Sequence, residues 1–139
     1  MKIARTQVIC LLTILIGLTA CDKIEPGLDN LKPDAKVLYD EGATRLTSEQ
    51  AKQHVSGNTE AWKAGAVYYD PDGKLELFWN QTRLKGNWEI QDSGSICFDV
   101  PSWNITCHFY LDHEGSITTI RNDKIIGILK VKPGKHLAR

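Results

Sequence analysis

The pattern of hydrophobic and polar residues changes its period at about residue 59. From Thr59 onward apolar residues recur at every second position, as they do on one face of a β-strand. Leu75, Leu77 and Trp79 share such a face, and turn residues such as Asp70-Pro71-Asp72-Gly73 separate the alternating runs. We therefore expect a mainly β fold, in which an antiparallel meander of about seven strands curls into a small barrel or a strongly bent sheet.

The expected strands leave no room for crossover helices, which disfavours a parallel α/β fold. The expected strands lie at about residues 59–69, 74–79, 88–90, 96–100, 105–111, 116–121 and 124–132. Trp62 shares a face with Ala64, Ala66 and Tyr68 if the first run is one strand. We expect Trp62, Trp79 and Trp88 to lie in the core, since each alternates with polar neighbours.

One short helix is predicted before the strands. Thr47-Ser48-Glu49-Gln50 fits a capping box, in which the Thr47 hydroxyl accepts from the Gln50 amide and the Gln50 side chain reaches back. The helix should run from about Ser48 to Val55 and end before Gly57, which tolerates a left-handed conformation. His54 lies in its last turn, where the helix dipole favours a cation, and we interpret it as structural.

The first 20 residues have the pattern of an export signal. Lys2 and Arg5 precede a nearly unbroken apolar run, Val8 to Leu18, which is shorter than the roughly 20 residues of a membrane-spanning helix. Leu18-Thr19-Ala20-Cys21 resembles the lipobox of bacterial lipoproteins, in which the cysteine is acylated and begins the mature chain. We expect residues 1–20 to be a lipoprotein signal peptide, with an ordinary secretory signal or a short anchor as alternatives.

Acylation of Cys21 would attach the protein to a membrane on the periplasmic side of the cell envelope. Asp22 resembles the inner-membrane retention residue of some enteric lipoproteins, which favours that membrane. Residues 21–44 are rich in charge and interrupted by Pro26, Gly27, Pro33 and Gly42, so we interpret them as a tether, on which Val37 to Tyr39 are positioned to dock against the domain. Residues 45–139 are then a single β-domain.

Two cysteines remain for a disulfide, since Cys10 leaves with the signal and Cys21 takes the lipid. Cys97 and Cys107 are equidistant from Ser102, so a hairpin centred there places them opposite each other. Disulfides persist in exported proteins, and this one should stabilise the fold by roughly 2–3 kcal/mol. Free thiols or metal binding are the alternatives, although two cysteines at this spacing do not supply a zinc site.

The charge balance gives no reason to expect nucleic-acid binding. Removal of residues 1–20 takes away two basic side chains and no acidic one, which leaves 15 basic against 17 acidic side chains. The C-terminal tail is locally basic, with Lys130, Lys132, Lys135, His136 and Arg139. We interpret it as a solvated end, with weak attraction to anionic lipid head groups as the alternative.

Candidate chemistry is sparse, and neither a cofactor nor a metal is expected. Asp70, Asp72 and Glu76 lack the ligand set of a calcium loop, since Gln81 stands at its twelfth position. No nucleophile elbow, zinc-binding helix or phosphate loop occurs, so no catalytic residue is predicted. Trp103, near the tip of the disulfide-closed hairpin, is the candidate binding residue. Alternatively, it folds back over the open end of the barrel as a plug.

Several motifs follow one another in a fixed order. They are Ser56-Gly57-Asn58-Thr59, Tyr68-Tyr69-Asp70-Pro71-Asp72-Gly73, Gly86-Asn87-Trp88-Glu89-Ile90, Gly94-Ser95-Ile96-Cys97-Phe98 and Cys107. Together they resemble a family of small exported bacterial proteins known as a domain of unknown function. His113-Glu114-Gly115 departs from the Asp-Gly expected at that turn. The resemblance implies a single exported β-domain and carries no activity.

These observations favour a lipid-anchored cell-envelope protein that is a non-catalytic binding or accessory module for a partner protein or small ligand. An inhibitor or chaperone-like factor for an envelope enzyme is one alternative, and a hydrolase of cell-wall glycans is another. An exposed apolar groove near Trp103 would favour the first two hypotheses. A cleft with two carboxylates of perturbed pKa would favour the hydrolase.

Overall fold

The structure, a computed structural model, describes residues 33–101 and 103–137, so the predicted signal peptide and Cys21 lie outside the described residues. The described chain forms two short helices and ten strands. The helices are α1 (Lys36–Asp40) and α2 (Ser48–Val55). The strands are β1 (Thr44–Arg45), β2 (Asn58–Trp62), β3 (Gly65–Tyr69), β4 (Lys74–Trp79), β5 (Thr82–Ile90), β6 (Ile96–Asp99), β7 (Thr106–His113), β8 (Ser116–Arg121), β9 (Lys124–Gly127) and β10 (Lys130–Pro133).

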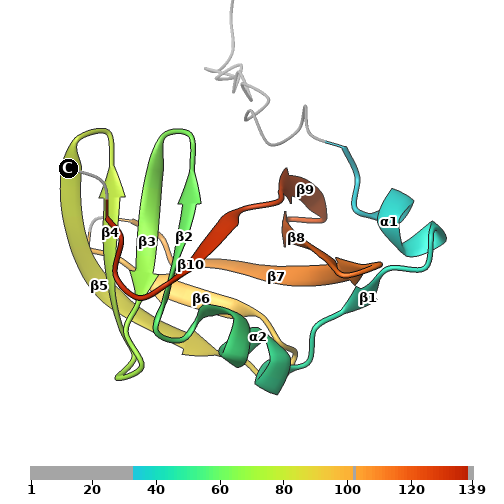
Figure 1. The fold of residues 1–139 in the computed structure, drawn as a ribbon, viewed down its shortest axis with the longest axis horizontal. Coiled ribbons are helices and arrows are strands. Elements are labelled where there is room, and N and C mark those ends of the chain that lie inside the picture. Colours follow the sequence, from blue (N-terminus) through green and yellow to red (C-terminus); the bar gives the residue numbers. More distant parts are fainter. Residues whose placement is uncertain (1–32, 102, 138–139) are drawn as a thin grey trace, which may run out of the picture.

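The strands form one curled antiparallel sheet in the order β10-β2-β3-β4-β5-β6-β7-β8-β9, with β1 paired to β7. In Figure 1, β2 to β5 stand at one end, β7 runs across the molecule, and β8, β9 and α1 lie at the other end. The two edge strands, β9 and β10, are separated in the chain by residues 128–129 alone. The sheet therefore bends back towards its own beginning and forms an incomplete barrel, which confirms the predicted mainly β class.

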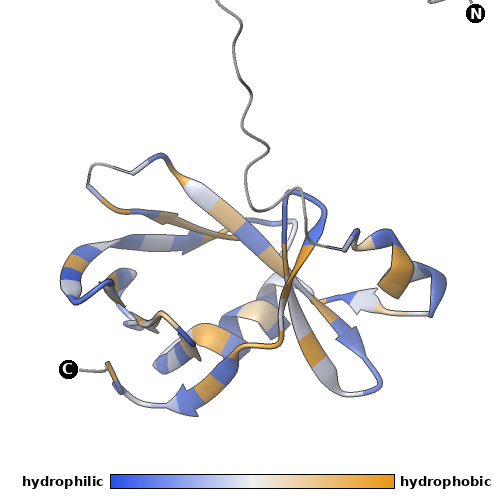
Figure 2. Ribbon diagram, turned by 90° about the horizontal axis from the view of Figure 1, so that it is seen from above, coloured by the Kyte–Doolittle hydropathy of each residue, from blue (hydrophilic) through white to orange (hydrophobic). Residues whose placement is uncertain are grey.

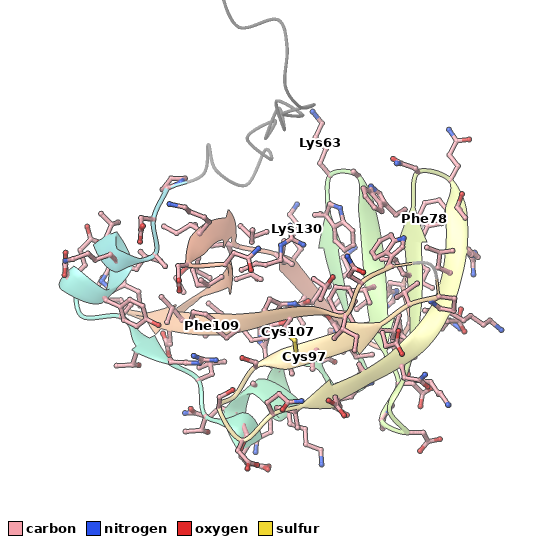
Figure 3. All side chains as sticks on the ribbon, turned by 180° about the vertical axis from the view of Figure 1, so that it is seen from behind. Lys63, Phe78, Cys97, Cys107, Phe109 and Lys130 are labelled. Carbon is pink, nitrogen blue, oxygen red and sulfur yellow. A yellow bond between two sulfur atoms is a disulfide. The ribbon has the colours of Figure 1, made fainter. Side chains whose placement is uncertain are left out.

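The predicted count of seven strands is too low. The run at residues 59–69 is a hairpin of β2 and β3, in which Trp62 pairs with Gly65 across a turn at Lys63 and Ala64. Lys63 marks the tip of this hairpin (Figure 3). A two-residue turn moves the inward face from even to odd positions, so Glu60 and Trp62 share a face with Val67 and not with Ala66. Residues 124–132 likewise divide into β9 and β10.

Helix α2 has the predicted bounds and the predicted capping box. The Thr47 hydroxyl accepts from the Gln50 amide at 3.2 Å, and the Gln50 side chain accepts from the Thr47 amide at 2.9 Å. Gly57 follows the helix with φ of 74°. Ala51 and Val55 are fully buried, and they hold the helix against the sheet.

The cysteines also lie as predicted. Cys97 on β6 pairs directly with Cys107 on β7, and the two form a disulfide with a Cα–Cα distance of 4.1 Å (Figure 3). Cys97 is buried and Cys107 is exposed. The disulfide therefore closes the β6–β7 loop, which carries Trp103, at the surface of the sheet.

The described part of the predicted tether belongs to the folded body. Ala35 and Ala43 are buried in a cluster with Leu111 and Ile120, and Thr44 on β1 pairs with Asp112 on β7. The domain boundary predicted at residue 45 thus lies nearer the N-terminus. Within the described residues, no helix has both the length and the apolar character needed to span a membrane.

The main core lies between α2 and the inner face of β3 to β7. Alternation of hydrophobic and hydrophilic residues along the strands is visible in Figure 2. Trp88 is buried, as predicted, and its indole Nε1 donates to the Asp70 carbonyl at 2.8 Å. The prediction for Trp62 and Trp79 is wrong, because their side chains are 36% and 40% exposed. Both face an opening in the curled sheet.

Candidate functional site

The inner face of the curled sheet encloses a cavity of about 430 Å³. This volume is in the range of small-molecule sites, about 300–1,000 Å³. Most of its described lining residues are apolar: Trp62, Ala64, Val67, Leu75, Leu77, Trp79, Phe98, Trp103, Ile126 and Leu129. Five more have polar groups: Glu60, Tyr69, His108, Thr119 and Arg121. The cavity thus combines an apolar wall with a small polar region.

Three tryptophans, which we call the tryptophan mouth, line the cavity on its solvent side: Trp62, Trp79 and Trp103. The rings of Trp79 and Trp103 meet edge to face, with centroids 5.1 Å apart and planes at 89°. Trp103 is half-buried and packs against the main core. The structure therefore places the predicted binding residue in the wall of the cavity, and its contact with a ligand stays a prediction.

A buried polar group lies deeper, and we call it the base cluster: Glu60, Tyr69, His108 and Tyr110. Glu60 on β2 is only 1% exposed. Its Oε2 accepts the Tyr69 hydroxyl at 3.0 Å, and its Oε1 accepts the Tyr110 hydroxyl at 2.7 Å. The register of the β2–β3 hairpin places Glu60 on the inner face of the sheet. Tyr69 on β3 and Tyr110 on β7 then supply the two hydroxyls that hydrogen-bond its carboxylate.

Histidines approach the same carboxylate from two elements. Nε2 of His108, on β7, lies 2.8 Å from the Tyr110 hydroxyl and 4.0 Å from Oε2 of Glu60. Nε2 of His54, on α2, lies 3.8 Å from Oε1 of Glu60, and its ring meets Tyr110 edge-on. The helix thus contributes His54 to the outer side of the base cluster.

Burial controls the protonation of these groups. It raises the pKa of Glu60 to about 7, although the hydroxyls of Tyr110 and Tyr69 oppose the shift by stabilising the carboxylate. It lowers the pKa of His108 to about 4, with the charges of Arg121 and His54 acting in the same direction. His108 is therefore neutral at pH 7, so its contact with Glu60 is not an ion pair. The pKa of His54 is lowered by burial as well.

The tyrosines remain hydrogen-bond donors over the physiological range. Burial raises the pKa of Tyr69 and of Tyr110 well above the ordinary value, and the neighbouring Glu60 charge adds to the effect. Each hydroxyl therefore keeps its proton and stabilises the buried carboxylate of Glu60. No group of three or more His, Cys, Asp or Glu in the described chain is arranged to hold a metal ion.

The sequence analysis did not identify the base cluster. A glutamate two positions before Trp62 in an alternating strand is the signal that was available, because it places a carboxylate on an inward face. His108 and Tyr110 alternate in the same way on β7. Of the predicted site residues, the structure brings Trp103 to the cavity and Cys97 to Cys107, while Cys21 lies outside the described residues.

Fold and site together define a small β-protein with a disulfide, an incomplete barrel and an open pocket on the inner face of its sheet. Over residues 27–118, more than half of the chain, the sequence matches the family described as "Protein of unknown function (DUF995)", and the protein belongs to this family. The resemblance to a domain of unknown function is thereby confirmed. The matched span includes the whole base cluster. No curated protein and no solved structure matches the chain.

Proposed function

We propose that this protein is a lipid-anchored cell-envelope protein whose curled sheet binds a small, largely apolar ligand without catalysis. The observation that carries the proposal is the cavity, which has apolar walls, a tryptophan mouth and the polar base cluster at its inner end. Ligand sites in proteins commonly have this combination of an apolar surface and a few convergent polar groups. The alternation of pocket-facing residues along several strands fixes the shape of the wall.

The location of the protein is part of the same proposal. Leu18-Thr19-Ala20-Cys21 supports acylation of Cys21 and a position on the periplasmic face of a membrane. A disulfide between Cys97 and Cys107 is in keeping with an oxidising compartment. Attachment to a membrane suits a carrier or sensor of apolar molecules, since its ligands partition into lipid.

The shape of the site favours a small ligand over a docked protein segment. The apolar surface is a concave pocket of small-molecule size on the inner face of the sheet, whereas docking of a protein segment would use a longer exposed groove. For the hydrolase alternative, two carboxylates flank the scissile bond in most glycosidases. Among the described lining residues of this cavity, Glu60 is the single carboxylate.

Binding of a neutral apolar fluorophore tests the proposal. The mature chain with Cys21→Ser, exported through an ordinary secretory signal, is titrated with N-phenyl-1-naphthylamine. We expect saturable binding of one dye per chain, with energy transfer from the tryptophan mouth. Trp103→Ala should weaken binding about tenfold, because it removes a large aromatic contact.

Ile105→Ala is the matched control, since Ile105 is exposed on the same loop and does not line the cavity. It should bind the dye as the unsubstituted chain does. Absence of saturable binding, or equal weakening by both substitutions, would contradict a ligand site in this cavity.

A further inference from the structure

We propose that the pocket takes a neutral, mostly apolar ligand whose polar group is a hydroxyl that donates a hydrogen bond to Nδ1 of His108. This inference rests on the proposed function, because it names the class of ligand for the same cavity. It follows from the direction of the hydrogen bonds in the base cluster.

The hydrogen-bond chain assigns the tautomer of His108. When Glu60 is ionised, both of its oxygens are acceptors, so the hydroxyl of Tyr110 donates its proton to Oε1 of Glu60. The oxygen of Tyr110 is then left to accept from Nε2 of His108 at 2.8 Å. Because the ring is neutral, a proton on Nε2 leaves a lone pair on Nδ1.

Nδ1 of His108 is an acceptor without a partner among the described residues. The hydrogen bond of this side chain is made by Nε2, and the ring lines the cavity. Phe98 meets the ring edge-on and offers no polar atom. With this tautomer, a ligand hydroxyl in the cavity can donate to Nδ1 and so adds a polar contact to the apolar ones.

Charges of both signs lie near His108, so they give no net preference for an anionic or a cationic ligand. A ligand carboxylate at His108 would be repelled by Glu60, whose Oε2 is 4.0 Å from the Nε2 atom of that histidine, and attracted by Arg121, and it has no proton to donate to Nδ1. A ligand ammonium would be attracted by ionised Glu60 and repelled by the guanidinium of Arg121, whose charge already lowers the pKa of His108. A hydroxyl meets neither repulsion and supplies the proton that Nδ1 lacks.

Three probes of equal length separate the possibilities at pH 8: 1-decanol, its isomer 1-methoxynonane and ionised decanoate. Each is measured by displacement of N-phenyl-1-naphthylamine from the Cys21→Ser chain. We expect the alcohol to bind about tenfold more tightly than the ether, which lacks the donor, and than decanoate. Equal binding of alcohol and ether, or tighter binding of decanoate, overturns this inference and leaves the apolar pocket standing. Failure of the dye and all probes to bind overturns the proposed function as well.

Substitution of His108 tests the acceptor itself. His108→Phe should bind the alcohol no better than the ether, whereas His113→Phe should keep the preference. His113 lies at the end of the same strand, contacts the Glu41 carbonyl and does not line the cavity, so it controls for replacement of a histidine on β7. Retention of the preference in His108→Phe overturns the assignment.

A spectroscopic readout on the unsubstituted chain does not depend on how the variants fold. The imidazole nitrogen resonance of His108 Nδ1 should shift on addition of 1-decanol and stay in place with 1-methoxynonane. The same shift with both probes, or with neither while the alcohol binds, excludes the proposed hydrogen bond.

Discussion

Glu60 occupies a position where an apolar side chain would be the ordinary choice. A carboxylate without water is costly unless it is hydrogen-bonded, and the hydroxyls of Tyr69 and Tyr110 reduce that cost. They do not remove it, since burial still raises the pKa of Glu60 to about 7. In the folded protein this residue therefore binds a proton more tightly than in the unfolded chain.

The sign of the resulting pH dependence follows from linkage. The folded pKa of Glu60 is above its ordinary 4.5, so its contribution to stability is present below pH 4.5 and lost as the pH rises through about 7. The folded pKa of His108 is below its ordinary 6.5, so its contribution is present above pH 6.5 and lost as the pH falls through about 4. Between about pH 4.5 and 6.5 the two trends oppose each other, which places the most stable range of this pair there.

Glu60→Gln isolates one of these trends. We compare the free energy of unfolding of the variant with that of the unsubstituted chain at each pH. The difference should shift in favour of the variant by on the order of 2–3 kcal/mol between pH 5 and pH 8, since the amide does not ionise. Urea unfolding at several pH values measures the difference. Glu89→Gln, at an exposed position on β5, reports what loss of a surface carboxylate does by itself. A constant offset for Glu60→Gln across this range would show that Glu60 does not titrate as described.

At the scale of the elements, the β6–β7 hairpin connects stability to the site. Its disulfide is near the main body of the sheet, and the loop beyond it carries Trp103 to the tryptophan mouth. The closed loop is short, so the cross-link removes chain entropy from the unfolded state. It also limits the positions that Trp103 can occupy.

Removal of the disulfide should therefore have two effects. The double variant Cys97→Ala, Cys107→Ala should lose roughly 2–3 kcal/mol of stability while its far-ultraviolet circular dichroism stays largely unchanged. Dye binding should weaken, because Trp103 is held less firmly. Thermal unfolding and the fluorophore titration measure the two effects on one sample. Two free thiols in the unsubstituted protein purified from the periplasm would contradict the cross-link.

Local signals explain which elements could be predicted from the sequence. The capping box of α2 involves residues three positions apart, and the cysteine pair is symmetric about Ser102, so both were predicted to the residue. The hairpin of β2 and β3 was missed because its turn, Lys63-Ala64, lacks glycine, proline and asparagine. If this turn is overlooked, the inward face of the run is assigned incorrectly. The sequence pattern then predicts neither the exposure of Trp62 nor the burial of Glu60. The base cluster joins residues from β2, β3 and β7, which periodicity along one strand cannot bring together.

At the scale of the whole molecule, the folded body begins close to the proposed anchor. Pro33, the first described residue, follows Cys21 by 12 positions, and an extended chain spans at most about 3.3–3.6 Å per residue. The folded body would thus stay within roughly 40 Å of the membrane surface. Ligands that partition into the bilayer would be concentrated within reach of the pocket.

Cys21→Ser tests the anchor. The substitution should move the protein from the membrane fraction to the soluble periplasmic fraction or mislocalise it, because the acyl chains are lost. Cys10→Ser is the matched control, since it changes a cysteine inside the apolar run and should leave the protein on the membrane. Fractionation of cells that express each variant measures the outcome. Membrane association of Cys21→Ser equal to that of the unsubstituted protein would refute lipid attachment at this residue.

Among the described residues, the incomplete closure of the sheet leaves β10 with one side unpaired, and the composition of that strand matters for copies held side by side on a membrane. A bare strand edge is a template on which a second molecule can add its own strand. Lys130, Lys132 and Pro133 are all exposed on this four-residue edge. Like charges repel an incoming copy, and proline has no amide proton to offer it. Anchored molecules would be crowded in two dimensions, and this edge would resist the fibre-like association that crowding promotes.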